Sequence, residues 1–395
     1  MAEKMVPQPP KLTPAAPKSA SAGPGFDYKA VLQHMIQSNA SDLHLKVGRP
    51  PTLRIDGHMV SMELPALKQE DLRSLAEQIM APKNIKEFSE QKESDFALAV
   101  PGVGRFRVNA YQQRGTIAYA LRTVPFQAKT IAELNLPEVC ERISLMHRGL
   151  ILVTGITGSG KSTALASMLH YINQNRHANI ITIEDPIEFL HRDIKSSINQ
   201  REVGTDTNSF GQALRRVLRQ DPDILLVGEI RDLDTLDTAL KAAETGHLVF
   251  STLHTTDATQ TINRVLSFYP PHQQTEVRYM LSTALRAIIS LRLVRRADKK
   301  GRVPAAEILV NTEAVRDQIR DLSKALNIPD LIKQGSVAYG MQTFDRSLMN
   351  WYHKGVISYD DALFTSTNPA EFALRAQGIN ASSDTSWDSV KQEVT

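Results

Sequence analysis

A glycine-rich loop between an apolar run and a helical pattern constrains this chain more than any other feature. Residues 150–153 are aliphatic, residues 155–162 read Gly-Ile-Thr-Gly-Ser-Gly-Lys-Ser, and residues 161–169 begin a pattern typical of a helix. Glycines let backbone amides turn toward a phosphate, and the N-terminus of a helix adds a partial positive charge. Because strand, loop and helix follow in this order, the sequence predicts a phosphate-binding loop in an α/β domain.

The residue types of this loop suit a nucleoside triphosphate and its magnesium ion. Lys161 is expected to contact the β- and γ-phosphates, and the hydroxyl of Ser162 is expected to coordinate Mg²⁺. We predict that magnesium is held by Ser162 and that ATP is held by Gly155, Thr157, Gly158, Ser159, Gly160, Lys161, Ser162 and Thr163. A phosphate loop alone does not distinguish a kinase, a switch protein and a motor, so the other strands must do so.

Three further apolar runs follow, and each ends in a side chain that can take part in hydrolysis. The runs and the side chains after them are 180–183 with Glu184, 221–227 with Glu229, and 248–253 with His254. Parallel strands bring their carboxyl ends to one edge of a sheet, where ligands bind. The pattern predicts a parallel sheet of the RecA type, flanked by helices, with the nucleotide along that edge.

The residues after these runs indicate how a bound triphosphate is hydrolysed. We predict that Glu229 activates the attacking water. An aspartate usually holds the metal at this strand end, but Gly228 stands there, so we expect Glu229 to reach the metal through water. His254 directly follows its strand and is better placed than His247 to sense the γ-phosphate, although a structural role is the alternative for a single histidine.

The first part of the chain carries the patterns of a small α+β domain. Asp27 can cap a helix whose apolar residues, from Tyr28 to Ile36, fall on one face. Alternating apolar residues at 43–47 and 53–55 predict short strands separated by turns.

Two later strands of this domain carry arginines. In 105–109, apolar residues alternate with Arg105 and Arg107, which therefore share a polar face. Arg122 likewise points away from the alternating apolar residues of 117–121. These arginines can be the solvated side of a sheet or can serve a ligand, and the pattern of this domain alone leaves both open.

A length of 395 residues exceeds the usual size of one core, so we expect two domains. Segments rich in Pro, Ala and Ser cannot offset their ordering entropy by burial. We predict a flexible tail at 1–26, an N-terminal domain at 27–125, a linker at 126–137, an α/β domain at 138–376 and a flexible tail at 377–395.

Composition excludes several classes of protein. No run of about eighteen uncharged apolar residues is present to cross a bilayer, and the N-terminus lacks the apolar core of a secretory signal, so we expect a cytoplasmic protein. One cysteine, Cys140, excludes an internal disulfide and a site of several thiolates. Basic residues number 46 against 43 acidic ones, and the basic run 292–302 is typical of a solvated hairpin. Nucleic acid is therefore not the expected partner, and a nucleic-acid motor stays an alternative.

Four segments together resemble the signature boxes of the type II/IV secretion ATPases. They are GITGSGKST at 155–163, IEDPIE at 183–188, LLVGEIRD at 225–232 and TGHLVFSTLHT at 245–255. Segments 40–57 and 340–345 further resemble the members of that family that retract type IV pili. The resemblance covers about residues 28–375.

This resemblance implies a PAS-like N-terminal domain, a RecA-like ATPase domain and a homohexameric ring with ATP between the two domains. It implies that Arg107 and Arg122 approach the γ-phosphate when the domains close, with Arg105 a further candidate. Glu184 and Glu229 match the two catalytic glutamates of the family, and His254 matches the principal histidine of its last box.

The resemblance also implies a setting for the protein: a cytoplasmic motor at the inner membrane that drives pilus retraction and twitching motility. Its implied partners are an inner-membrane pilus platform protein and the pilus assembly ATPase or an accessory ATPase. Retraction members commonly carry Ala-Ile-Arg-Asn-Leu-Ile-Arg-Glu, and residues 314–321 read Ala-Val-Arg-Asp-Gln-Ile-Arg-Asp here. The alternatives are an assembly or accessory ATPase, and a scaffold that binds nucleotide without hydrolysing it.

Overall fold

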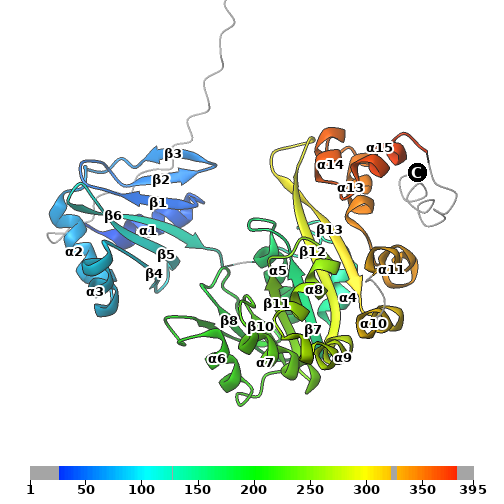
Figure 1. Cartoon of the computed structure of the whole chain (residues 1–395). Helices are drawn as coiled ribbons and strands as arrows, with labels where there is room; N and C mark the ends of the chain where they lie inside the picture. The colour runs from blue at the N-terminus through cyan, green and yellow to red at the C-terminus, as the bar shows by residue number, and fades with distance from the viewer. Residues whose placement is uncertain (1–25, 127, 322–326, 380–395) are drawn as a thin grey trace, which may run out of the picture. The chain divides into compact units, whose positions relative to one another are not determined.

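The chain divides into two compact units, Met1–Phe126 and Gln127–Thr395. The computed structural model describes residues 26–126, 128–321 and 327–379 (Figure 1). The first unit is an α+β domain and the second an α/β domain with a largely parallel sheet, so the predicted fold class is confirmed.

The tails predicted at 1–26 and 377–395 fall almost entirely outside the described residues. Within the ranges that are described, no helix combines the length and the apolar character needed to span a membrane. Of the predicted linker 126–137, Ile131 and Leu136 are buried in the core of the second unit, so most of this segment packs as a part of that unit.

The N-terminal unit is a six-stranded antiparallel sheet, in the order β3-β2-β1-β6-β5-β4, with three helices. The strands are β1 (Asp42–Leu45), β2 (Thr52–Ile55), β3 (His58–Ser61), β4 (Glu93–Val100), β5 (Gly104–Gln113) and β6 (Thr116–Val124). The helices are α1 (Tyr28–Gln37), α2 (Gln69–Ile79) and α3 (Pro82–Gln91). The predicted cap of α1 is confirmed, because the Asp27 carboxylate accepts the N–H of Ala30 at 3.1 Å.

Strand alternation divides this sheet into an apolar face and a charged face. Phe106 and Tyr119 are fully buried among residues of α1 and α2, and the Tyr119 hydroxyl donates to the carbonyl of Leu72 at 2.9 Å. Arg107 and Arg122 pair across β5 and β6 and point to the other face. The predicted polar face is therefore present on a well-packed sheet.

The C-terminal unit is built on a seven-stranded sheet in the order β13-β12-β7-β11-β10-β8-β9. The strands are β7 (Gly149–Thr154), β8 (Asn179–Glu184), β9 (Ser197–Glu202), β10 (Ile224–Val227), β11 (Leu248–Leu253), β12 (Leu285–Arg295) and β13 (Arg302–Val310). All neighbours pair in parallel except β12 and β13, which form an antiparallel hairpin. The predicted strand at 221–227 is shorter than expected, because Asp221 has a left-handed backbone (φ +52°) and Pro222 has no N–H for a ladder.

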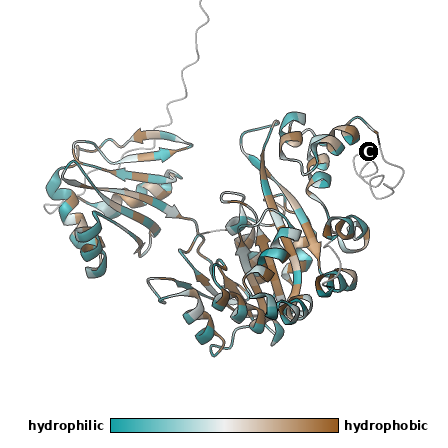
Figure 2. Ribbon diagram, viewed as in Figure 1, coloured by the Kyte–Doolittle hydropathy of each residue, from teal (hydrophilic) through white to brown (hydrophobic). Residues whose placement is uncertain are grey.

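Helices cover both faces of this sheet and exclude water from it. One face carries α4 (Val139–Ser144) and α5 (Lys161–Asn175). The other carries α6 (Phe210–Val217), α7 (Leu233–Glu244), α8 (Ala258–Ser267), α9 (Gln274–Ala284), α10 (Glu313–Arg320) and α11 (Ile328–Gln334), with a short 3₁₀ turn at Pro271–Gln273. Figure 2 shows the apolar residues concentrated on the strands between these layers. Strands covered on both faces are apolar throughout, which is why their sequences do not alternate.

The predicted hairpin at the basic run 292–302 is confirmed by β12 and β13. The expectation of a solvated run is wrong for Arg292, whose guanidinium lies 3.8 Å from the centre of the Phe344 ring. Arg292 also donates to the carbonyl of Thr365 at 2.7 Å and to the hydroxyl of Thr367 at 3.1 Å. Burial lowers the pKa of this guanidinium.

Arg292 is half-buried because the last helices fold over the hairpin. These helices are α12 (Ser336–Tyr339), α13 (Phe344–His353), α14 (Tyr359–Thr365) and α15 (Pro369–Ala376). Val294 and Val303 of the hairpin form a small core with Phe344, Leu348 and Phe372. The C-terminal helices are thus anchored on β12 and β13.

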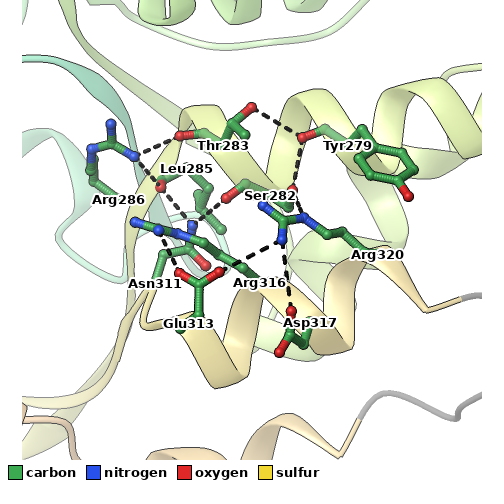
Figure 3. Close-up of polar contacts among 10 residues, drawn as sticks. All are labelled: Tyr279, Ser282, Thr283, Leu285, Arg286, Asn311, Glu313, Arg316, Asp317 and Arg320. Carbon is green, nitrogen blue, oxygen red and sulfur yellow. Dashed lines mark hydrogen bonds and ion pairs between the residues drawn. The ribbon is translucent and has the colours of Figure 1, made fainter.

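The segment 314–321, which departs from the family pattern, lies on α10 up to Arg320, and Asp321 follows the end of the helix (Figure 3). Its apolar positions Val315 and Ile319 are fully buried. The side chain of Arg320 donates to the hydroxyl of Ser282 on α9 at 2.9 Å, and Arg316 pairs with Glu313 at 2.7 Å. The altered segment therefore keeps a helical register that fixes α10 against α9.

One buried carboxylate has no counterpart among the predicted site residues. Glu307 on β13 is 7% exposed, and its Oε1 accepts the N–H of Ala258 at 2.8 Å. Burial raises its pKa from 4.5 to about 7. An ionised carboxylate at this position therefore costs the folded state free energy.

Replacing Glu307 by Gln should make thermal stability fall less as the pH rises from 4.5 to 8. Between pH 4.5 and 7 the folded wild type holds a proton that the unfolded chain has lost, so wild-type stability falls as pH rises through this window. The shift corresponds to about 3 kcal/mol, so the melting temperature of E307Q relative to wild type should rise by on the order of 5 °C from pH 4.5 to pH 8. A gap that is the same at both pH values contradicts this account.

Candidate functional site

The loop 155–162 has the backbone of a phosphate cradle. Gly155, Gly158 and Gly160 have φ angles of +141°, +80° and +96°, which favour glycine. A Cβ on Gly155 would lie 2.5 Å from the carbonyl oxygen of Leu291 on β12. The first glycine is therefore required by its close approach to the neighbouring strand as well as by its backbone angle.

Lys161 begins α5 and turns its side chain back over the loop. Its Nζ donates to the carbonyl oxygens of Gly155 at 2.8 Å and Ile156 at 3.1 Å. Burial lowers the pKa of this ammonium, and the negative charge of Glu229 opposes that shift. A cation held in this way can exchange carbonyl oxygens for the more strongly attracting oxygens of a phosphate.

The rest of the loop fits a bound triphosphate. No described side chain caps α5, so its first N–H groups are available to an anion. The hydroxyl of Ser159 is buried and has no hydrogen-bond partner among the described residues, whereas Thr157 and Ser162 are exposed. An exposed Ser162 hydroxyl at the start of α5 suits a magnesium ion that also binds phosphate oxygens.

The register of the parallel strands brings the other predicted residues to the same edge. Val227 pairs with Ile183 on β8 and with Ser251 on β11, and Leu253 pairs with Thr154 at the end of β7. The phosphate loop, Glu184 at the end of β8, and Glu229 and His254 just after their strands therefore lie at neighbouring positions of this edge.

Glu229 follows β10, the strand between β11 and β8. Its Oε1 lies 3.1 Å from Nε2 of His254, and its Oε2 lies 3.0 Å from a terminal nitrogen of Arg231. The Glu229 side chain is 22% exposed, and its charge acts on Lys161 of the phosphate loop. The structure thus brings three predicted residues, Lys161, Glu229 and His254, into one electrostatic group, and their catalytic roles stay predictions.

The two histidines that flank β11 have different surroundings. His254 faces Glu229, whereas Nδ1 of His247, at the other end of the strand, lies 3.0 Å from the carbonyl oxygen of Ala242 at the end of α7. The position of His247 suits a structural role.

Gly228 stands where an aspartate would hold a metal, and the packing explains the glycine. A Cβ on Gly228 would lie 3.2 Å from the carbonyl oxygen of Ile183. The N–H of Gly228 donates to the same carbonyl at 2.8 Å, and its own carbonyl accepts the hydroxyl of Thr252 at 2.7 Å. The backbone is therefore fixed by both neighbouring strands, with little room for a side chain.

Glu184 is more deeply buried than the sequence indicated, with 8% of its surface exposed. Its Oε1 accepts the hydroxyl of Thr182 at 2.7 Å and the amide of Gln200 at 3.1 Å. Burial raises the pKa of this carboxyl, against the effect of these hydrogen bonds. Glu184 is thus held within the sheet, and its predicted catalytic role stays a prediction.

Arg107 and Arg122 lie on the charged face of the N-terminal sheet. Nε of Arg122 donates to Asp42 at 2.8 Å, and the Arg122 side chain is 65% exposed. Asp42 is also 3.9 Å from Arg54, and Arg105 lies on the same face as Arg107. This face therefore gathers several arginines around one aspartate, whose pKa lies below its usual value because the hydrogen bonds and positive charge outweigh desolvation.

Sequence reasoning did not identify the groups that hold the predicted side chains. The contact of Thr182 with Glu184 could have been predicted from the sequence, since Thr182 precedes Glu184 by two residues and so shares its face of β8. The sequence indicates the contact of Arg231 with Glu229 less clearly, because Arg231 follows Glu229 by two residues in a loop. The sequence does not indicate the contact of Gln200 with Glu184, since this contact depends on the pairing of β9 with β8.

Comparison with known proteins places the chain in a family. The sequence profile of the type II/IV secretion system protein family matches residues 26–338. The chain belongs to this family. It is 47% identical over 347 residues to the type IV pilus retractation ATPase PilT of Pseudomonas aeruginosa, which covers 88% of this chain and 100% of that protein. It is also 40% identical to the type IV pilus ATPase PilU of the same organism, over 86% of this chain and 88% of the relative.

A solved structure supports the same family assignment. The crystal structure of the pilus retraction motor PilT with bound ADP is similar to this chain with a TM-score of 0.77 and 45% sequence identity, and the match covers 86% of this chain and 97% of that one. The predicted resemblance to the secretion ATPases is confirmed.

Replacing Gly155 by Ala should weaken ATP binding at least about tenfold, because the added methyl meets the Leu291 carbonyl and the left-handed backbone is strained. The dissociation constant of a fluorescent ATP analogue measures this. Gly246→Ala is the control, since Gly246 also has a positive φ (+116°) but open space around its Cβ position. Equal affinities in Gly155→Ala and wild type would show that the close approach is unimportant.

Proposed function

We propose that this protein is an ATP hydrolase that powers the retraction of type IV pili. The observation that carries the proposal is the position of Glu229, whose carboxylate oxygens lie 3.1 Å from His254 and 3.0 Å from Arg231 at the edge where Lys161 and the phosphate loop lie. Similarity to PilT over 88% of the chain supports the retraction role.

Binding of ATP rests on the phosphate loop. The backbone N–H groups of 155–163 and the ammonium of Lys161 hold the phosphates, and the Ser162 hydroxyl holds magnesium. When bound, that ion supplies positive charge that offsets the charge of the β- and γ-phosphates. The positive φ angles of the glycines let the loop bring several N–H groups toward one anion.

Hydrolysis rests on Glu229. Its carboxylate orients a water for attack on the γ-phosphorus and accepts a proton as the new phosphorus–oxygen bond forms, while the bond to the β-phosphate oxygen breaks. His254 and Arg231 each hold one oxygen of this carboxylate, so its direction is fixed before substrate arrives. His254 also senses the γ-phosphate, and Glu184 is a second glutamate of the site.

Movement rests on the two domains of the molecule. Residues 27–125 and 138–376 act as the two moving parts, and ATP lies between them in a ring of six identical subunits. Arg107 and Arg122 approach the γ-phosphate on closure, where an arginine can contribute roughly a thousandfold in rate. Release after hydrolysis opens the pair again, which converts chemistry into movement.

The motor acts in the cytoplasm against an inner-membrane platform protein, together with the assembly ATPase. The segment 314–321, whose Arg320 donates to Ser282, is a place where a change of sequence can alter how the motor couples to its partners. Its departure from the retraction pattern and the similarity to PilU keep an accessory ATPase as the second candidate. A nucleic-acid motor is less well supported, because Arg292 of the basic run is engaged by Phe344 and Thr365.

Glu229→Gln should lower the turnover number for ATP by at least about a hundredfold and leave ATP affinity within about threefold of wild type, because the amide keeps the size of the side chain but cannot accept the proton. Phosphate release and binding of a fluorescent ATP analogue measure the two effects. Glu244→Gln, at an exposed glutamate at the end of α7, is the control and should hydrolyse ATP normally. Substantial turnover by Glu229→Gln excludes this glutamate as the base.

Deletion of the gene should leave cells with excess surface pili and no twitching, since assembly continues while retraction stops. Electron microscopy of surface pili and a twitching assay give the two readouts, and the wild-type gene, but not the Glu229→Gln gene, should restore twitching. Cells without pili would show an assembly ATPase. Normal pilus numbers with residual twitching would show an accessory one.

A further inference from the structure

Glu307 connects the central sheet to the helix that follows His254. It lies on β13 at the position opposite Ser290 of β12, and its Oε1 accepts the N–H of Ala258, the first residue of α8, at 2.8 Å. Only residues 255–257 separate His254 from this helix. The carboxylate therefore fixes the point where the chain leaves the carboxyl edge of the sheet, after His254, and begins α8.

The turn between His254 and α8 is held together by its own hydrogen bonds. The Asp257 carboxylate accepts the N–H of Gln260 at 2.8 Å. The hydroxyl of Thr261 donates to the carbonyl of Asp257 at 2.7 Å and lies 2.6 Å from the hydroxyl of Thr255. These bonds are local and join residues 255–261 to one another, and the bond from Glu307 ties this turn to the sheet.

The same hairpin also supports the phosphate loop. The hydroxyl of Thr154, the last residue of β7, donates to the hydroxyl of Ser290 at 2.8 Å. The next residue of β12, Leu291, has the carbonyl that approaches Gly155. The β12–β13 hairpin thus contacts both the root of the phosphate loop and, through Glu307, the turn that carries His254.

A carboxylate is an energetically unfavourable group at this buried position. Glu307 is almost fully buried, and burial raises its pKa to about 7. The charges near it come from three elements: Asp257 at the start of α8, Arg292 on β12 and Asp345 on α13. Two of these three are acidic, and an ionised Glu307 costs stability. A group that lowers stability beside an active site is typical of a functional constraint.

We propose that Glu307 is a positioning residue for ATP hydrolysis, which holds the turn 254–258 so that Nε2 of His254 stays 3.1 Å from Oε1 of Glu229. The inference rests on the proposed function, in which Glu229 activates water and His254 fixes it. Glu307 acts through His254 and not through substrate, so its removal changes turnover more than ATP binding.

The test compares Glu307→Ala, Glu307→Gln, His254→Ala and the double variant His254→Ala with Glu307→Ala, all in the full chain. Glu307→Ala should lower the turnover number about tenfold with a KM for ATP within about twofold of wild type. Glu307→Gln keeps an oxygen that accepts the Ala258 N–H and should restore turnover to within about threefold of wild type. The double variant should be no slower than His254→Ala, since the two residues act along one route.

A matched control separates positioning from stability. Asp345→Ala removes a nearby carboxylate that accepts the N–H groups of Thr367 and Asn368 at 2.6 and 3.2 Å without a hydrogen bond to α8. It should lower the melting temperature and leave the turnover number unchanged. If Glu307→Ala does not fold, Ala258→Pro removes the same N–H donor at the first helical position, where proline is well tolerated, and should give the same loss of turnover.

Three results would overturn the inference. Turnover by Glu307→Ala, or by Ala258→Pro in its place, equal to wild type shows that the bond has no role. A double variant tenfold slower than His254→Ala shows that Glu307 does not act through His254. Glu307→Gln as slow as Glu307→Ala shows that the accepted N–H is not the basis of the effect. If His254→Ala itself hydrolyses ATP normally, the proposed role of His254 is wrong and the inference fails with it.

Discussion

The in-register parallel pairing of β7, β11, β10 and β8 is the constraint on which the site depends. These strands are apolar on both faces and are covered by helices on both sides, so a slip of one strand would expose buried residues and displace its polar end. Because Val227 pairs with Ile183 and Ser251, Glu184 at the end of β8 and the loops that carry Glu229 and His254 meet at one edge of the sheet. Burial of the strands therefore sets the positions of the polar groups.

Electrostatics at this edge follow from the same arrangement. Lys161 lies partly buried against its own loop, where the charge of Glu229 offsets part of its desolvation. Glu229 in turn has a partner on each oxygen. Charges of both signs are thus held close together before nucleotide binds, and little reorganisation is required when a highly charged substrate enters.

Much of this architecture could be predicted from the sequence, because its signals are local. Residues 155–162 carry a phosphate loop in its strand and helix context, and the Asp27 cap of α1 and the hairpin at 292–302 follow from neighbouring residues. The prediction that was wrong and the contacts that were not predicted depend on segments that are distant in the sequence. Arg292 is engaged by helices that follow it by about fifty residues or more in the chain, Glu184 is held by Gln200 of the adjacent strand, and Glu307 meets α8 only because β13 pairs beside β12.

The most direct test of the central claim is a structure of the protein with magnesium and a non-hydrolysable ATP analogue. The account predicts that Nζ of Lys161 leaves the carbonyls of Gly155 and Ile156 for phosphate oxygens, that the Ser162 hydroxyl coordinates magnesium, and that Glu229 lies about 3 Å from a water facing the γ-phosphorus. A triphosphate bound away from this edge, or a Glu229 that does not reach that water, would contradict it.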